Sequence, residues 1–114
     1  MAGERVQRRL AAILTADVVG YSRLIRADEE GTLAALKTLR ENIIDPKIAE
    51  HHGRIVKLMG DGLLAEFPSV VDAVRAAVEI QQTVAEHNAD LSEDRRIEFR
   101  VGINLTAPRV SRSV

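Results

Sequence analysis

The sequence contains no cysteine and no tryptophan, and only 3% of its 114 residues are aromatic. The absence of cysteine excludes a disulfide scaffold, a thiolate metal site and a cysteine nucleophile. The scarcity of aromatic side chains argues against a sheet that stacks unpaired bases. The formal charge is −1 at pH 7, with 16 Lys+Arg against 17 Asp+Glu, which excludes a polyanion binder held by bulk electrostatics. We therefore expect no nucleic-acid partner.

Long apolar runs are also missing. No stretch approaches the roughly 18 apolar residues that a membrane span requires. The apolar run after the basic N-terminus stops at Asp17, so we predict no signal peptide and no membrane span. With 46% hydrophobic and 29% charged residues, the composition is that of a globular protein. The sequence predicts one cytoplasmic domain over 9–104, with an N-terminal extension at 1–8 and an atypical tail at 105–114.

Hydrophobic periodicity predicts a strand and then a helix in the first half of the chain. The apolar run 10–16 is typical of a strand covered on both faces. Asp28 is placed to cap the helix, and Pro46 is expected to kink or restart it with Asp45 as a new cap. Gly53 is a suitable helix stop.

Two strands, 54–58 and 63–67, flank the turn Met59-Gly60-Asp61-Gly62, which is typical of a hairpin. A capping pattern at Ser69–Asp72 opens a second helix that runs to about Asn88. We expect this helix to pack on the sheet through small residues, namely Val71, Val74, Val78, Ala77 and Ala85.

Strict alternation of polar and apolar residues over 96–103 predicts the last strand. The resulting order, βαββαβ, predicts an α+β ferredoxin-like sandwich with an antiparallel sheet. In this fold the first strand is central and pairs antiparallel with the third. We therefore expect Asp17 and Asp61 to lie at the same edge of the sheet, although they are far apart in the sequence.

Two carboxylates at one sheet edge have the chemistry that hard cations such as Mg²⁺ prefer. The turn Val18–Ser22, directly after Asp17, would present backbone N–H groups to phosphates at a helix start. Each feature also has a plainer explanation. An aspartate at a strand end is often a helix cap, and Gly-Asp-Gly is often only a tight turn. Spacing alone leaves both interpretations open.

Three segments resemble the class III adenylate/guanylate cyclase catalytic domain: Ala16–Ser22 (ADVVGYS), Gly53–Phe67 (GRIVKLMGDGLLAEF) and Phe99–Asn104 (FRVGIN). The resemblance covers roughly 8–104 and is closest to the bacterial adenylate-cyclase branch. It implies a nucleotide cyclase-like sandwich. It also implies conversion of ATP to 3′,5′-cyclic AMP and pyrophosphate by two-metal catalysis in cyclic-nucleotide signalling.

The resemblance assigns a role to each matching position. Asp17 and Asp61 would be the catalytic metal ligands for two Mg²⁺ or Mn²⁺ ions, with the Val18 carbonyl as a further ligand. Lys57 matches a base-reading lysine, and because an ammonium group can donate to adenine N1, it favours ATP over GTP. The phosphates would be held by the backbone of Val19, Gly20 and Tyr21.

Several residues also have structural explanations. Lys57 lies on a predicted edge strand, where a lysine discourages unwanted strand pairing. The histidines show no metal-ligand spacing, and we expect solvated or capping roles for His51, His52 and His87. A solvated strand face is the expected role of Arg95, Arg96 and Arg100.

The sequence departs from the family after Asn104. The family continues with strands that supply a transition-state asparagine and an arginine across a dimer, but no Asn-x-x-x-Arg follows here. We therefore predict a C-terminally incomplete domain, through a frameshift or a deletion, with little or no activity alone. It would pair as a homodimer, or as a heterodimer with an intact cyclase domain. The alternative is a non-catalytic nucleotide-binding or dimerisation module. Uncovered apolar surface would favour self-association.

Overall fold

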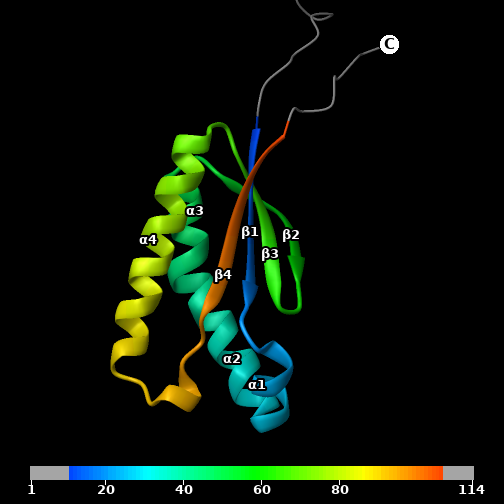
Figure 1. Ribbon diagram of the computed structural model, residues 1–114, viewed down its shortest axis with the longest axis vertical. Helices are drawn as coiled ribbons and strands as arrows, with labels where there is room; N and C mark the ends of the chain where they lie inside the picture. The colour runs from blue at the N-terminus through cyan, green and yellow to red at the C-terminus, as the bar shows by residue number, and fades with distance from the viewer. Residues whose placement is uncertain (1–10, 107–114) are drawn as a thin grey trace, which may run out of the picture.

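The computed structural model describes residues 11–106, and its elements follow the predicted order (Figure 1). They are β1 (Ala11–Val18), α1 (Tyr21–Ala27), α2 (Glu29–Leu39), the π-helical turn η2 (Arg40–Ile44), α3 (Asp45–Glu50), β2 (Arg54–Met59), β3 (Gly62–Phe67), α4 (Val70–Ala89), the 3₁₀ turn η3 (Glu93–Arg95) and β4 (Phe99–Thr106). The predicted extension at 1–8 and the part of the predicted tail beyond residue 106 lie outside the described residues.

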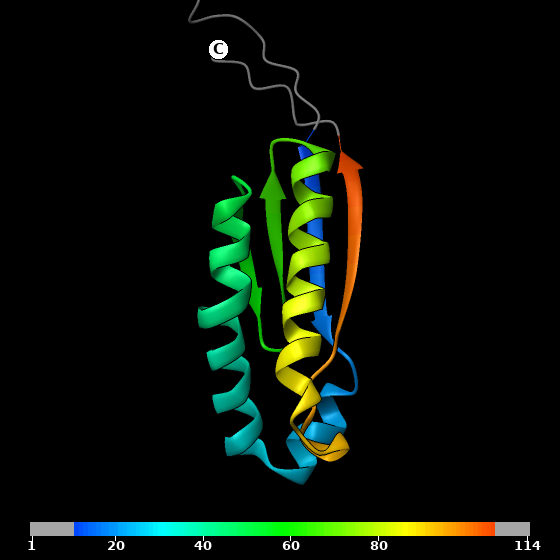
Figure 2. The same cartoon turned by 90° about the vertical axis from the view of Figure 1, so that its left-hand side faces the viewer.

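The four strands form one antiparallel sheet in the order β2-β3-β1-β4. The central position of β1 and its pairing with β3 confirm the predicted ferredoxin-like fold. Figure 2 shows α2, α3 and α4 on the same side of this sheet. No helix of the described chain is long and apolar enough to cross a lipid bilayer.

One face of β1 is covered by the helices and the other is not. Its residues alternate, with Ala12, Leu14, Ala16 and Val18 buried and the residues between them half-exposed. The prediction of a strand covered on both faces is therefore wrong for the described chain. The strand continues one residue past the end of the predicted apolar run and Asp17, because Val18 pairs with Phe99 of β4.

Asp28 caps α2 as predicted, since its side chain accepts a hydrogen bond from the Gly31 amide.

At Pro46 the helix does not restart with a new cap. The chain passes from α2 through η2 into α3 without leaving helical geometry, and Pro46 falls in the first turn of α3, where proline is tolerated. Asp45 is not a cap, because it is itself helical and its carboxylate accepts from Arg40 at 3.1 Å.

The chain leaves α3 through His52, which adopts the left-handed conformation with φ 68°. Gly53, the predicted stop, does not have a positive φ. Its role is steric, because a Cβ at Gly53 would lie 2.4 Å from the ring of Phe67. Gly53 is therefore a packing position under a fully buried aromatic ring.

The face of α4 that packs on the sheet differs from the predicted one. Ser69 caps the helix as expected, accepting from the Asp72 amide, but Val71, Val74 and Val78 are exposed by 57%, 44% and 48%. The buried positions are instead Ala73, Ala76, Ile80, Val84 and Asn88. Both sets have helical spacing, and the alanines allow α4 to approach the sheet more closely than the valines would.

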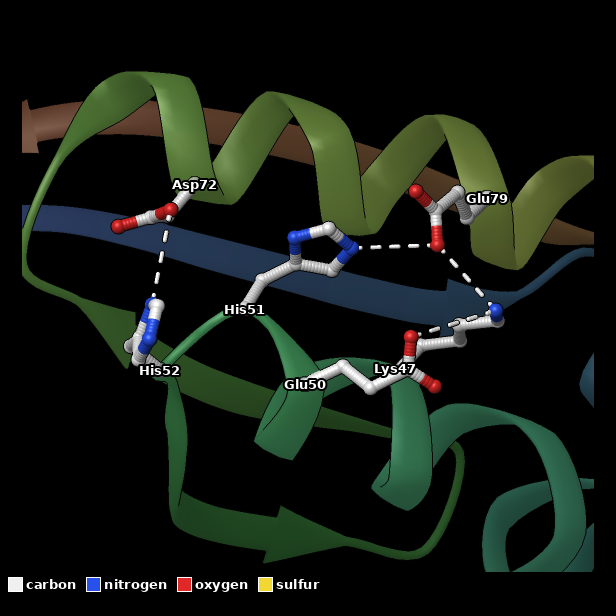
Figure 3. Close-up of polar contacts among 6 residues, drawn as sticks. All are labelled: Lys47, Glu50, His51, His52, Asp72 and Glu79. Atoms are coloured by element: carbon white, nitrogen blue, oxygen red, sulfur yellow. Dashed lines mark ion pairs between the residues drawn. The ribbon is translucent and has the colours of Figure 1, made fainter.

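Ion pairs join α3 to the flank of α4 that faces it (Figure 3). Glu79 on α4 lies 3.2 Å from the Lys47 ammonium and 3.1 Å from Nε2 of His51, both contacts being made by Oε1. These contacts, first with His51 and then with Lys47, lower the pKa of Glu79 below its usual 4.5. The hydrogen bond to Glu79 raises the pKa of Lys47 in turn.

The Glu79 contacts predict an acid-sensitive stability. A carboxylate whose pKa is lowered by folding stabilises the fold above its unfolded pKa, and this stabilisation is lost as the pH falls through its folded value. We expect Glu79→Gln to lower the free energy of unfolding at pH 7 and to approach wild type below about pH 4.5. Urea unfolding over a pH series measures this. Glu86→Gln, an exposed change on the same helix, is the control. A gap between Glu79→Gln and wild type that is constant with pH would contradict the assignment.

Asn88 predicts a second stability effect. Its buried amide donates to the Ile97 carbonyl at 2.9 Å and accepts from the Ile97 amide at 3.4 Å. Asn88→Leu leaves both backbone groups without a partner, which should lower the free energy of unfolding by about 1–3 kcal/mol. Gln82→Leu, an exposed change on α4, is the control, and both are measured by urea unfolding. Equal effects of the two variants would show that the bonds to Ile97 contribute nothing.

Candidate functional site

The two acids singled out in the sequence meet at one edge of the sheet. Asp17 is opposite Gly62 in the β1–β3 register. The Val18 amide donates a hydrogen bond of 2.8 Å to the backbone carbonyl of Asp61. The predicted proximity of the two positions is confirmed, and their role as metal ligands stays a prediction.

Gly62 permits this close approach of the β2–β3 hairpin to β1. A Cβ at Gly62 would lie 2.2 Å from the carbonyl oxygen of Ala16 and 3.0 Å from the Cα of Asp17. Since both atoms belong to the backbone, any side chain at this position would push the hairpin away. The glycine after Asp61 is therefore required by the contact with β1.

Asp17 lies on the uncovered face of the sheet, where it forms an ion pair. Its Oδ1 is 3.2 Å from Nε of Arg100, its register partner on β4. Arg100 is therefore more than part of a solvated strand face, as the sequence predicted. The two side chains are 51% and 72% exposed, and an ion pair this open to water contributes at most about 1 kcal/mol. A divalent cation can compete with it.

The turn after β1 is only partly free to bind a ligand. Gly20 takes the left-handed conformation with φ 67° and precedes α1. The Val19 amide already donates to the Glu98 carbonyl at 2.9 Å, so this N–H is not free, and the predicted phosphate role of Val19 must be corrected on this point. The hydroxyl of Tyr21 lies 3.6 Å from where a Cβ of Gly60 would be, so the turn and the hairpin are neighbours. The phosphate roles of Gly20 and Tyr21 stay predictions.

Lys57 occupies the predicted edge strand and is exposed. It is opposite Leu64 on β3, which is opposite Thr15 on β1. Lys57 and Asp17 therefore share the uncovered face but stand two strands apart, a lateral separation of about 10 Å. The structure does not bring Lys57 beside the two acids of its own chain.

A cleft next to Asp61 was not anticipated from the sequence. It has a volume of about 200 Å³ and lies between α2–η2 and the β2–β3 hairpin. Its walls are mostly apolar, with Lys37 and Arg40 as the cationic groups and Asp61 as the acidic one. The helical spacing of Lys37 and Arg40 was the available clue, but only the packing of α2 against the hairpin brings them near Asp61.

A second group of ligand-type side chains lies away from the two acids. Ligand atoms of Glu50, His51 and Glu79 all fall within 4.8 Å of one another. His51 has no metal-ligand spacing in the sequence, and the packing of α3 on α4 creates this proximity. The Lys47 ammonium lies 3.6 Å from Glu50 and 3.2 Å from Glu79 (Figure 3). It already supplies the positive charge that these carboxylates require.

No family model matches the chain. Comparison with known proteins nevertheless finds relatives that are named adenylate cyclases. The chain is 50% identical over 105 residues to "Putative adenylate cyclase 3" of Rhizobium meliloti, covering 92% of this chain and 18% of that protein. It is 36% identical over 100 residues to an adenylate cyclase of Streptomyces coelicolor, covering 88% of this chain and 24% of the relative.

A solved structure with a similar fold also carries a cyclase name. The adenylate/guanylate cyclase/hydrolase from Silicibacter pomeroyi superimposes with a TM-score of 0.81 and 45% sequence identity, covering 90% of this chain and 60% of that chain. The present chain thus spans less than a quarter of either curated relative and 60% of the solved one. Its sequence and its fold together make it a homologue of the class III adenylate/guanylate cyclase catalytic domains.

Proposed function

We propose that this chain is a nucleotide cyclase-type domain that binds ATP with divalent cations and supplies the metal-binding side of a catalytic site. The observation that carries the proposal is the hydrogen bond between the Val18 amide and the Asp61 carbonyl, which places two carboxylate-bearing residues at one edge of the sheet. The adenylate cyclase names of its relatives support the reaction class.

The donor groups present fit Mg²⁺ or Mn²⁺. Asp17 and Asp61 offer hard carboxylate oxygens, and both side chains are accessible to solvent. The Val18 carbonyl would be a further oxygen donor. When bound, two such ions would lower the pKa of the ribose 3′-hydroxyl and neutralise charge on the pyrophosphate leaving group.

Other residues of the chain would position the nucleotide. The Gly20 and Tyr21 backbone N–H groups at the start of α1 would donate to phosphate oxygens. Lys37 and Arg40 add positive charge at the cleft beside Asp61. Lys57 would select adenine over guanine, and its separation from Asp17 by two strands supports a site that another domain completes.

Turnover is proposed to require that second domain. Charge that develops on the phosphorus in the transition state needs stabilising groups, and in this proposal the second domain supplies them. We propose either a homodimer with low activity or a heterodimer with an intact cyclase domain, in which this chain lends Asp17 and Asp61.

Replacing the acids tests the metal site. Asp17→Asn and Asp61→Asn each remove one anionic ligand while keeping the side-chain size. We expect isothermal titration calorimetry to detect Mn²⁺-dependent ATP binding by the wild-type chain, and each variant to lose it. Glu66→Gln, which changes an acid on the same sheet face, should bind as wild type does. If the wild-type chain does not bind ATP with metal, the non-catalytic module is the correct interpretation.

A mixing experiment tests the composite site. An intact homologous cyclase domain, inactivated by replacing its own two metal aspartates with asparagine, is mixed with this chain, ATP and Mn²⁺. We expect cyclic AMP to form only in the mixture, and to disappear when this chain carries Asp61→Asn. Robust turnover by this chain alone would show that it needs no second domain.

The Asp17–Arg100 ion pair predicts an effect on metal affinity. Arg100→Gln removes the cation that occupies Asp17, and since an exposed pair is worth up to about 1 kcal/mol, Mn²⁺ should bind up to about fivefold more tightly. Arg54→Gln is a matched control, because Arg54 pairs with Glu66 on the same face and the net charge changes equally. An equal increase in Mn²⁺ affinity for both variants would show that the effect comes from net charge and not from Asp17.

A further inference from the structure

Three side chains of the metal-ligand type meet between α3 and α4. Glu50 ends α3, His51 follows it directly, and Glu79 projects from α4 toward them (Figure 3). Their ligand atoms all lie within 4.8 Å of one another. Glu50 is exposed, whereas His51 and Glu79 are half-buried, so the group is partly shielded from water and still accessible. One imidazole nitrogen with two carboxylate oxygens is a donor set that Zn²⁺ binds.

His51 has a buried nitrogen atom that the fold leaves without a partner. Its Nε2 is inaccessible to solvent and has no hydrogen-bond partner within residues 11–106. Nε2 lies 3.1 Å from Oε1 of Glu79, but the contact does not have hydrogen-bond geometry. Buried polar atoms are nearly always paired, so an exception requires an explanation. A metal ion bound to both atoms would satisfy this nitrogen.

The distance between these two atoms fits a shared metal ion. Zn²⁺ binds nitrogen and oxygen ligands at about 2.0–2.1 Å in tetrahedral geometry, which places neighbouring ligand atoms about 3.3 Å apart. The 3.1 Å between Nε2 of His51 and Oε1 of Glu79 is close to this separation. The Glu50 side chain is 57% exposed at the end of a helix, so it is free to rotate into the third position. Water would take the fourth, as in other sites with three protein ligands.

The Lys47 ammonium shows where these carboxylates attract a cation. It lies 3.2 Å from Oε1 of Glu79 and 3.6 Å from Oε1 of Glu50. The ammonium balances the charge of the two carboxylates, but it leaves Nε2 of His51 without a hydrogen bond. Lysine carries its charge on a flexible four-carbon stem, and this side chain is 27% exposed. It can therefore move aside for a metal ion that binds all three ligands.

We propose that Glu50, His51 and Glu79 form a Zn²⁺ site, in which the metal ion takes the place of the Lys47 ammonium and joins the end of α3 to α4. The imidazole distinguishes this site from the proposed cyclase site, whose carboxylates suit harder ions such as Mg²⁺. The two sites share no residue, so the inference does not depend on the proposed function. A metal ion that binds only the folded chain stabilises it, and we assign the site a structural role.

Isothermal titration calorimetry of the full chain with Zn²⁺ tests the proposal. Every protein carries Asp17→Asn and Asp61→Asn, which remove the carboxylates of the proposed cyclase site. We expect one Zn²⁺ per chain and at least about tenfold weaker binding by His51→Gln, since even the outer partners of metal ligands contribute 10–100-fold to affinity. His52→Gln is the matched control and should bind as the parent does. His52 also lies near a carboxylate of α4, at 3.8 Å from Asp72, but belongs to no group of three ligands in the described chain.

Two results of this titration would overturn the proposal: no Zn²⁺ binding by the parent chain, or equal losses in His51→Gln and His52→Gln. Far-UV circular dichroism checks that each variant is folded. If His51→Gln does not fold, Glu50→Gln replaces it, because Glu50 is exposed, and it should also weaken Zn²⁺ binding. In thermal unfolding, Zn²⁺ should raise the Tm of the parent chain more than that of either variant.

Replacing Lys47 gives a measurement of opposite sign. Lys47→Met removes the competing ammonium, so the Zn²⁺ affinity should rise by up to about fivefold, the most that exposed ion pairs of this kind are worth. Lys57→Met is the matched control, because it removes the same charge from β2. An affinity that Lys47→Met leaves unchanged or lowers would overturn the proposal, and so would an equal rise in both variants.

Discussion

The candidate site depends on the contact between the end of β1 and the β2–β3 hairpin. The Val18 amide binds the Asp61 carbonyl, and the hairpin lies so close to β1 that Gly62 has no space for a side chain. This contact is made by backbone atoms, so it holds the two acids near each other whatever the state of their side chains. The carboxylates remain accessible and are free to change partners, as the exposed ion pair of Asp17 with Arg100 shows.

The second constraint is the one-sided packing of the sheet. The helices cover a single face (Figures 1 and 2), so the alternation of β1 divides its residues into a buried row and an accessible row. Asp17 belongs to the accessible row, with Lys57 two strands away on the same face. An arrangement that separates these groups in one chain is suited to a site completed by two domains, which is why we place Lys57 in a partner's site.

The sequence predicted the elements well and their local endings less well. Capping by Asp28 and Ser69 was predictable because the donor and acceptor lie within one turn. The helical conformation of the chain through Pro46 was not predictable, because the π-helical turn and the Arg40–Asp45 ion pair depend on how α2 and α3 pack. The same holds for Gly53, whose role is set by the Phe67 ring on another strand. In α4, two apolar rows have helical spacing, and only contact with the sheet decides that the alanine row is buried.

The sequence by itself determined the βαββαβ order, the antiparallel pairing of the first and third strands, and hence the meeting of Asp17 and Asp61, because period and turn chemistry are local properties. Only the tertiary structure decided what surrounds those acids: the Arg100 partner, the engaged Val19 amide, and the cleft with Lys37 and Arg40. It also brought His51 to Glu79 and left Val71, Val74 and Val78 of α4 exposed. The physical reason is that each of these features joins groups from different elements, whose relative placement is set by close packing of the whole core.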